Sequence, residues 1–459
     1  MYSDIQFKNI EDNNTLNSTY GLDLFFYFYN GYTSLNEKGE FMSHITAKKS
    51  YEQLVDRLNK YPQGAPPSES LYKILSMLFS EKEAKLVAQL PIRPFEIKTA
   101  AKRWSVSHSE ASKVLEDLAS RAVLLDIYKE GKVFYVLPPP MAGFFEFSMM
   151  RTRGDINQEL LGQLYYEYLN VEEDFVKQLF TGTETNMVRA FCNESVLTTD
   201  DAVTILDFEK ASHYIKTSEH MGISMCYCRH KMQHMNQACD APMDICMTFG
   251  PVAESLIRHG HARKTDAVEG MELLHQAYEH NLVQCGENMK KGVSFICNCC
   301  GCCCEALLAA KRFGNLHPIE TTQFIAEVNR ASCTECGRCV NACPVDAIEI
   351  VDNKVGVIEE LCLGCGVCVR NCNFDSMLFK KREVKIITPD SSVHRSVLMA
   401  IEKGKLQNLI FDNDALYSHR AMAAIISAIL KLSPVKRAMA SDQMKSVYLL
   451  KILSVLGYK

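Results

Sequence analysis

The fold is decided by two cysteine runs: Cys333-Thr-Glu-Cys336-Gly-Arg-Cys339-Val-Asn-Ala-Cys343-Pro344 and Cys362-Leu-Gly-Cys365-Gly-Val-Cys368-Val-Arg-Asn-Cys372. Both have the spacing C-x2-C-x2-C-x3-C, and the second repeats the first at an offset of 29 residues, from 333 to 362. Thiolates suit iron, and this spacing lets three sulfurs on one tight loop hold three corners of a cubane. The fourth cysteine of each run lies too far along the chain and points at the other cluster.

The repeat therefore predicts two [4Fe–4S] clusters with crossed ligation. We assign Cys333, Cys336, Cys339 and Cys372 to the first cluster, and Cys362, Cys365, Cys368 and Cys343 to the second. Zinc and a disulfide framework are the alternatives, but a zinc site needs only four ligands and this doubled pattern of eight is not typical of it. At this point the segment resembles the bacterial two-cluster ferredoxin domain.

The second run departs from the pattern at one position. Pro344 follows Cys343, whereas Asn373 follows Cys372. Proline has no backbone donor, while asparagine adds an N–H and a side-chain amide. Hydrogen bonds to cluster sulfur favour the reduced state, so we expect Asn373 to act on the first cluster and the two clusters to differ in potential.

Composition sets the class of protein. A chain of 459 residues exceeds one core, so two to four domains are expected. The formal net charge of −5 argues against nonspecific nucleic-acid binding. All twenty cysteines lie between residues 192 and 372, and no signal peptide is recognised, which favours metal ligation in a reducing cytoplasm over disulfides. No apolar run approaches the roughly 18 residues of a membrane span.

A second cysteine-rich region precedes the two runs. Its first block contains Cys226, Cys228, Cys239 and Cys246, which are enough for a third cluster; zinc is the alternative, although C-x-C is shorter than the usual gap. Its second block contains Cys297, Cys299, Cys300, Cys302, Cys303 and Cys304. An extended chain alternates its side chains, so these six cannot all face one metal. Some must serve another site or remain without a metal.

Two residues beside the first block are candidate neighbours of a cluster. Arg229 and His230 follow Cys228 directly and could donate hydrogen bonds that offset the negative charge of a cluster. A helix over 271–282 is expected to bring the two blocks together.

The N-terminal part predicts a winged-helix-like module. We expect helices from Ser70 to about Leu90, from about Ile97 to Arg103 and, after the capping box Ser107-x-x-Glu110, on to Arg121, followed by a hairpin around 129–131. The exposed side of the third helix is mixed in sign, whereas groove readers present a basic face. We therefore expect a docking or structural module and not a DNA-binding one.

The fold class expected is α+β, a mainly helical multidomain chain with this module and a ferredoxin domain. The expected segments are 1–41 (N-terminal extension), 42–69 (helix and Pro-rich linker), 70–140 (winged-helix-like domain), 141–225 (helical domain), 226–304 (Cys-rich metal region), 305–330 (linker), 331–380 (two-[4Fe–4S] ferredoxin domain) and 381–459 (helical C-terminal tail). Within 141–225, helices are expected over 157–180 and 208–221.

The combined layout resembles a group of large bacterial iron–sulfur proteins described as 4Fe–4S dicluster proteins. They share a winged-helix-like N-terminal part, a C-x-C-R-H block, an I-C-N-C-C-G-C-C-C block and a ferredoxin domain, and the resemblance covers about residues 42–440. It implies iron–sulfur clusters and leaves the reaction undefined.

What the chain lacks narrows the function. No G-x-G-x-x-G, P-loop, H-E-x-x-H or G-x-S-x-G motif occurs, and we find no NAD or flavin site. We expect a cytoplasmic electron-transfer protein or oxidoreductase subunit that relays low-potential single electrons to or from a redox partner, such as a flavoprotein or a metalloenzyme. One alternative is an oxidoreductase whose special cluster in 226–304 acts on a small substrate. The other is an iron–sulfur redox sensor that acts as a DNA-binding regulator.

Overall fold

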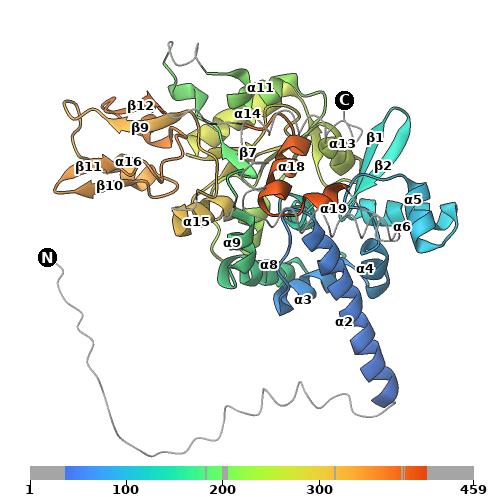
Figure 1. Cartoon of the computed structure of the whole chain (residues 1–459). Helices are drawn as coiled ribbons and strands as arrows, with labels where there is room; N and C mark the ends of the chain where they lie inside the picture. Colours follow the sequence, from blue (N-terminus) through green and yellow to red (C-terminus); the bar gives the residue numbers. More distant parts are fainter. Residues whose placement is uncertain are drawn as a thin grey trace, which may run out of the picture. The chain divides into compact units, whose positions relative to one another are not determined.

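The computed structural model describes residues 37–180, 183–198, 205–314, 317–383, 386 and 388–410, with side chains from Lys48 to Leu409 (Figure 1). Residues from Lys48 onward form one compact unit, and Met1–Ala47 form another. Most of the expected N-terminal extension, and the C-terminal tail beyond residue 410, lie outside the described residues. No described helix is long and apolar enough to cross a membrane.

The N-terminal module contains helices followed by a hairpin. Its elements are α2 (Glu37–Lys60), α3 (Glu69–Leu78), α4 (Glu81–Val87), α5 (Ile97–Trp104), α6 (His108–Ser120), β1 (Leu125–Lys129) and β2 (Lys132–Val136). The helix expected from Ser70 to Leu90 is broken, because Ser80 caps α4 in a capping box with Glu83 and ends α3 before it. The capping box of Ser107 and Glu110 starts α6, where the sequence predicts it.

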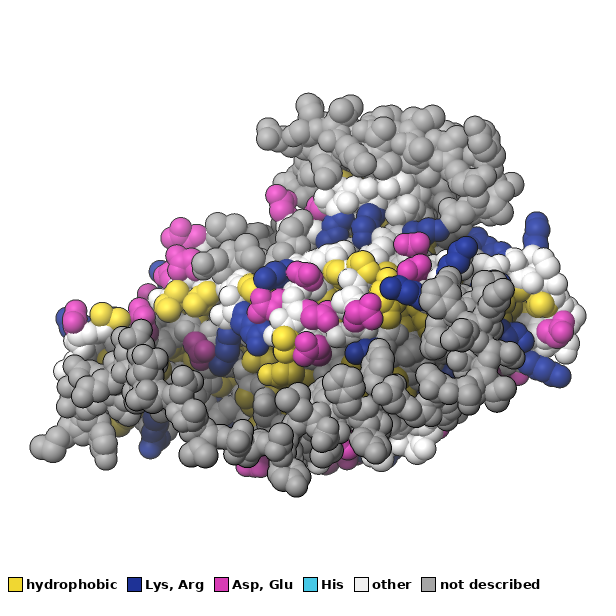
Figure 2. Space-filling view, turned by 90° about the horizontal axis from the view of Figure 1, so that it is seen from below, with side chains coloured by type: hydrophobic (Ala, Val, Ile, Leu, Met, Phe, Trp, Pro, Cys, Tyr) yellow, Lys and Arg dark blue, Asp and Glu magenta, His cyan; other side chains and the backbone are white. Residues whose placement is uncertain are grey.

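The hairpin of this module packs against the rest of the unit. On β1, the buried Asp126 accepts hydrogen bonds from Ser255 Oγ at 2.5 Å and Arg258 Nη1 at 2.7 Å, both on α13 (Gly250–Arg258). The Arg258 guanidinium lies 4.1 Å from the centroid of the Tyr128 ring. On the face drawn in Figure 2, basic and acidic side chains are interspersed over the described part, in keeping with the small net charge.

A six-stranded antiparallel sheet forms the centre of the unit. The strand order is β3-β7-β8-β5-β4-β6. The strands are β3 (Val188–Ala190), β4 (Met221–Met225), β5 (Asp244–Phe249), β6 (Arg263–Thr265), β7 (Val283–Glu287) and β8 (Phe295–Cys299). The sequence predicts a helical segment over 141–225, yet β3 and β4 come from it. The helix expected over 208–221 is α11 (Ala211–Thr217), which stops before β4 begins.

The two faces of the sheet are covered differently. On one face, Met247, Phe249 and Ile296 belong to a core shared with α11 and with α14 (Ala267–Glu279), which is the helix expected over 271–282. The other face lies toward α7 (Phe145–Met149), α8 (Gln158–Tyr166), α9 (Asp174–Phe180) and α12 (Tyr227–His234). The helix expected over 157–180 is interrupted by a π-type turn, Glu167–Val171, between α8 and α9.

The last part carries the two cysteine runs. Its elements are β9 (Phe324–Val328), α16 (Arg338–Ala342), β10 (Ile348–Val351), β11 (Lys354–Val357), α17 (Val367–Arg370) and β12 (Met377–Lys381). β9 pairs with β12, β10 pairs with β11, and both pairs are antiparallel (Figure 1). The helices α18 (Ser392–Glu402) and α19 (Leu406–Ile410) follow.

A buried charge pair joins α12 to α15 (Glu305–Arg312), the two helices that carry cysteines at their starts. Lys231 and Glu305 form an ion pair with side chains 0 % and 1 % exposed. Asn170 completes the network, accepting from Lys231 at 2.6 Å and donating to Glu305 at 2.9 Å.

We expect Lys231→Met to destabilise the protein by about 3–5 kcal/mol, because it leaves the Glu305 carboxylate buried without its cation. Lys311→Met is the matched control: its ion pair with Asp346 is largely exposed, so the loss should stay below about 1 kcal/mol. Anaerobic thermal unfolding followed by circular dichroism measures both. Equal melting temperatures for the two variants would contradict this account of the α12–α15 junction.

Candidate metal centres

The two cysteine runs have matching backbones as well as matching spacings. Gly337 and Gly366, 29 residues apart, both take left-handed φ angles, of 74° and 82°, and each precedes a short helix, α16 or α17. Such φ angles suit glycine, which lets the cysteine loop turn sharply into its helix. The repeat seen in the sequence is therefore also a repeat of structure.

The fourth cysteine of each run receives equivalent hydrogen bonds. Cys343 Sγ accepts the N–H of Ala347 and Cys372 Sγ accepts the N–H of Ser376, each at 3.2 Å. Partial burial acts to raise the pKa of the Cys372 thiol. N–H donation from residues 374, 377 and 376 outweighs it, so the pKa is lowered. Asn373 itself is exposed and is not one of these donors. The backbone donors to Cys372 thus come from the residues after Asn373.

Cys343 lies with the cysteines of the other run. Burial raises the pKa of Cys365, and the nearby charge of Cys343 raises it further. Burial and the charge of Cys343 also raise the pKa of Cys368. The charge of Cys362 in turn raises the pKa of Cys343. This arrangement is the one that crossed ligation requires for the second cluster.

The two sets of cysteines differ in depth. In the first set, Cys336 is exposed and Cys333 is half-buried. In the second set, Cys362 and Cys368 are buried. We call the site around Cys336 the outer cluster site and the site around Cys365 the inner cluster site.

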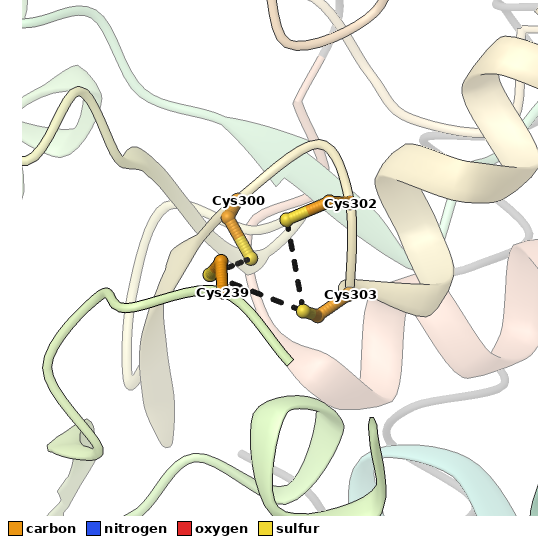
Figure 3. Close-up of side chains that lie close together, drawn as sticks. All are labelled: Cys239, Cys300, Cys302 and Cys303. Atoms are coloured by element: carbon orange, nitrogen blue, oxygen red, sulfur yellow. Dashed lines mark hydrogen bonds between the residues drawn. The ribbon is translucent and has the colours of Figure 1, made fainter. Parts of the chain in front are cut away.

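Four thiols of the other cysteine-rich region form a tight group: Cys239, Cys300, Cys302 and Cys303. All four Sγ atoms lie within 4.8 Å of one another, and the shortest separations are 3.5, 3.7 and 3.9 Å. Cys239 comes from the segment after α12, the others from the loop between β8 and α15 (Figure 3). A tetrahedral ion with metal–sulfur bonds of about 2.3 Å has sulfurs about 3.8 Å apart. The four-thiol group therefore fits a single tetrahedral metal ion.

The Arg229 side chain touches this group. It is fully buried, and its Nη1 lies 3.7 Å from Cys300 Sγ while Nη2 donates to the Asn298 carbonyl at 3.1 Å. Contact with Cys303 lowers the pKa of Cys300 to about 4, burial opposes this, and the Arg229 charge lowers it further. The contact with Cys303 and the charge of Arg229 thus favour the thiolate form of Cys300, which is the form that binds metal.

His230 has a different place. One ring nitrogen lies 2.7 Å from the Met149 carbonyl and the other 3.3 Å from the ring of His234. Both nitrogens are therefore engaged away from the thiols.

A second group of thiols lines a cavity of about 300 Å³ beneath the sheet. It comprises Cys226, Cys228, Cys246, Cys285, Cys297, Cys299 and Cys304. Cys300 of the four-thiol group also lines the cavity, so the two groups adjoin at this residue. Cys285 and Cys297 are opposite each other on β7 and β8, and Cys299 follows two residues later, so all three point to one face. Cys246 on β5 lies beside them, with its Sγ 4.0 Å from that of Cys297.

The structure thus divides the cysteines differently from the two blocks of the sequence. Cys239 joins Cys300, Cys302 and Cys303, whereas its block-mates 226, 228 and 246 line the cavity. The alternation expected within the second block occurs at its centre, where neighbouring residues 299 and 300 belong to different groups.

Both cysteine groups adjoin the inner cluster site. Gly301, in the loop of the four-thiol group, packs on the backbone of Pro344 so closely that a Cβ at 301 would overlap the Pro344 carbonyl oxygen. On the cavity side, Cys285 lies near enough to Cys365 for its charge to raise the pKa of that thiol, although burial is the larger cause. Metal held by either group would therefore be close to the inner cluster.

Comparison with known proteins identifies the segment of the two runs. Residues 324–382 match the family of the 4Fe-4S dicluster domain. The chain is an iron–sulfur protein. No curated protein and no solved structure matches it.

Two cysteines of this iron–sulfur protein have no partner at a recognisable spacing. Cys192 and Cys285 are both buried, and the sequence analysis assigns neither to a site. Cys285 lines the cavity nonetheless. The signal for it in the sequence is a cysteine in the strand-like run 283–287. Its position opposite Cys297, twelve residues further along the chain, depends on the pairing of β7 with β8.

Cys343→Ala tests the crossed ligation. We expect loss of the low-temperature EPR signal of the inner cluster, because Cys343 lies with Cys362, Cys365 and Cys368, while the outer cluster keeps its signal. Cys372→Ala is the matched variant and should have the opposite effect. If each variant instead lost the cluster nearest to the substituted cysteine in sequence, the ligation would not be crossed.

Cys302→Ser tests the four-thiol group. Because Cys302 is exposed, the substitution should leave the fold intact. We expect it to remove about one tetrahedral metal ion per chain, zinc or iron, without loss of inorganic sulfide, since a single ion brings none. Metal and sulfide analysis of variant and parent checks this. Loss of about four irons with four sulfides would instead show that a cubane binds there.

Proposed function

We propose that the protein transfers low-potential single electrons between a redox partner and the metal centres of residues 226–304, through two [4Fe–4S] clusters. The observation that carries the proposal is the packing of Gly301 on Pro344, the residue next to inner-cluster ligand Cys343. It puts a thiol group outside the dicluster segment directly beside a cluster site. A simple two-cluster carrier has no need of such a contact.

The order of the sites supports a directional route. Electrons enter at the outer site, where Cys336 is exposed. The outer and inner sites adjoin each other, since the charge of Cys339 acts on the thiol of Cys368. From the inner site, Cys285 and Gly301 lead to the cavity and to the four-thiol group. The four-thiol group can accept an electron only if its ion is iron, because zinc does not change its oxidation state.

Exposed apolar side chains in the dicluster segment support the proposal of a protein partner. Four of the ten exposed large apolar side chains among the described residues lie between 350 and 378: Ile350, Val351, Phe374 and Leu378. These side chains come from β10, from β12 and from the turn before β12, and exposed apolar side chains that gather in one region are a feature of protein–protein contacts. We propose that a flavoprotein or a metalloenzyme docks there and exchanges electrons with the outer cluster.

Reduction of a small substrate at the cavity is a second candidate function. Glu146 lines the cavity, and its carboxylate oxygens accept N–H groups of residues 142 and 143 at 2.7 and 3.0 Å. Burial raises the pKa of Glu146 to about 8, so this carboxyl carries a proton at neutral pH. Electrons from the inner cluster and a proton from Glu146 would together supply reductive chemistry. This acid beside the thiols is the observation that favours the enzyme alternative.

The regulator alternative receives less support. In a DNA-binding winged helix the hairpin is free to contact the duplex, whereas β1 is held here by Ser255 and Arg258 of α13. The exposed side of α6 carries Glu110, Glu116 and Asp117 beside one lysine, Lys113. We therefore propose a structural role for this module.

Gly301→Ala tests the relay. The added methyl group must push the cysteine loop away from Pro344, so we expect electron transfer from the dicluster segment to the cysteine-rich region to slow severalfold at unchanged metal content. Stopped-flow reduction by a low-potential viologen, with freeze-quench EPR, measures this rate. Gly154→Ala is the control, because a Cβ there meets no atom within 4 Å. Unchanged transfer in Gly301→Ala would rule out this route.

A further inference from the structure

We infer that the seven thiols that line the cavity and lie outside the four-thiol group bind one polynuclear iron–sulfur cluster that contains more irons than a cubane, at a site that adjoins the four-thiol group at Cys300. The cavity is lined by thiols from β5, β7, β8 and the starts of α12 and α15. A cubane takes one thiolate for each of its four irons. Seven converging thiols exceed that number by three.

The thiols form a connected ring. Cys228 contacts Cys226 and Cys304, Cys304 contacts Cys299, and Cys299 contacts Cys285 and Cys297. Cys246 lies beside Cys297, and the charges of Cys226 and Cys228 are close enough to raise its pKa. Every member therefore has a sulfur neighbour, and the ring surrounds the cavity.

The spacing within the ring argues for several metals and against a single ion. Among the described residues, the four-thiol group is the one set in which three or more ligand atoms lie within 4.8 Å of one another. The cavity thiols do not meet this limit, and neither do those of the dicluster segment, which matches a [4Fe–4S] family. The cavity thiols thus share the wide spacing of the dicluster cysteines and not the tight spacing of the four-thiol group.

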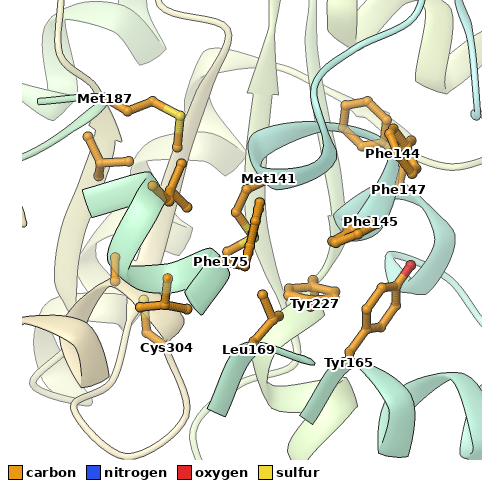
Figure 4. Close-up of a cluster of buried hydrophobic side chains, with 14 of the residues drawn as sticks. Met141, Phe144, Phe145, Phe147, Tyr165, Leu169, Phe175, Met187, Tyr227 and Cys304 are labelled. Carbon is orange, nitrogen blue, oxygen red and sulfur yellow. The ribbon is translucent and has the colours of Figure 1, made fainter. Parts of the chain in front are cut away.

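The remaining walls of the cavity suit a buried cluster. Met141, Phe147 and Met187 line it together with Tyr227 and Cys304 (Figure 4). An apolar wall excludes water, which protects a cluster and controls its potential. Two buried polar atoms of residues that line the cavity, Tyr227 Oη and Arg229 Nε, have no hydrogen-bond partner among the described residues. Buried polar atoms are normally satisfied, so both point to a ligand that the chain itself does not provide.

The charge balance favours an anionic occupant. Cys226 is the N-cap residue of α12 and Cys304 that of α15, so two helix N-termini face the thiols with their positive ends. Arg229 adds a full charge on the same side. Of the three acidic residues in the lining, Glu287 and Glu305 are paired with the buried cations Arg395 and Lys231, and burial raises the pKa of Glu146. Neutral thiols would need none of these groups, whereas a thiolate-ligated cluster is a buried anion that must be compensated.

The first experiment counts iron. Full-length protein and the variant Cys226→Ser/Cys297→Ser/Cys299→Ser are reconstituted anaerobically in parallel with iron and sulfide, and iron per chain is compared. We expect the variant to lose more than about four irons while the EPR signals of the dicluster segment persist, which shows that it is folded. A loss of four irons or fewer overturns the inference, because it means an ordinary cubane or no cluster.

The second experiment keeps the protein close to its native state. Each of the seven cysteines is replaced singly by serine, with Cys192→Ser as control because Cys192 is buried and does not line the cavity. Mössbauer spectra of the iron-57 proteins should change in all seven variants and not in the control. Changes in only four variants would identify a cubane with three bystander thiols, and changes in none would show that the cavity holds no iron.

Failure here and failure of the relay are distinguishable. The cavity cluster can be present even if Gly301→Ala transfers electrons at the parent rate, because Gly301 is not a ligand and six of the seven ring thiols lie outside its loop. Conversely, a relay that ends at the four-thiol group would survive loss of the cavity cluster.

Discussion

The need to neutralise buried thiolates shapes this protein more than any other constraint. A thiolate in an apolar interior is costly unless a metal or a cation compensates it. The chain meets this need with its backbone: N–H groups reach Cys343 and Cys372, and helices begin at Cys226 and Cys304. The sheet and the surrounding helices hold these donors in place. The Lys231–Glu305 pair, which joins α12 to α15, fixes two of the helix starts relative to each other.

The sequence predicts the local metal chemistry well because that chemistry is local. The spacing C-x2-C-x2-C-x3-C places three sulfurs on one turn whatever surrounds it, and the family match at 324–382 agrees with the [4Fe–4S] expectation. Capping boxes are equally local, and the one formed by Ser107 and Glu110 begins α6 where expected. The sequence also predicts the order of helices followed by a hairpin in the N-terminal module, because the signals for these elements are local too.

Long-range grouping is what the sequence cannot supply. Whether Cys239 meets Cys246 or Cys300 depends on strand register and on the loop between β8 and α15. Cys285 has no partner at a fixed spacing, and its role follows only from being opposite Cys297 on the next strand. Strands β3 and β4 were missed because short runs beside strong helices carry little periodic signal. Hydrogen bonding at Cys372 depends likewise on the turn that follows Asn373, not on Asn373 alone.

The strand order has a consequence for how the protein matures. β3 pairs with β7, so a long stretch of chain, from Val188 to Val283, must be enclosed before the sheet can close. Non-local pairing of this kind is slow, because chain entropy is lost before contacts repay it. Until then the cavity cysteines are dispersed along an open polypeptide and exposed to oxidation. Metal binding that stabilises the folded chain couples metal delivery to folding, so we expect the yield of native protein to rise with the supply of iron and sulfide during synthesis.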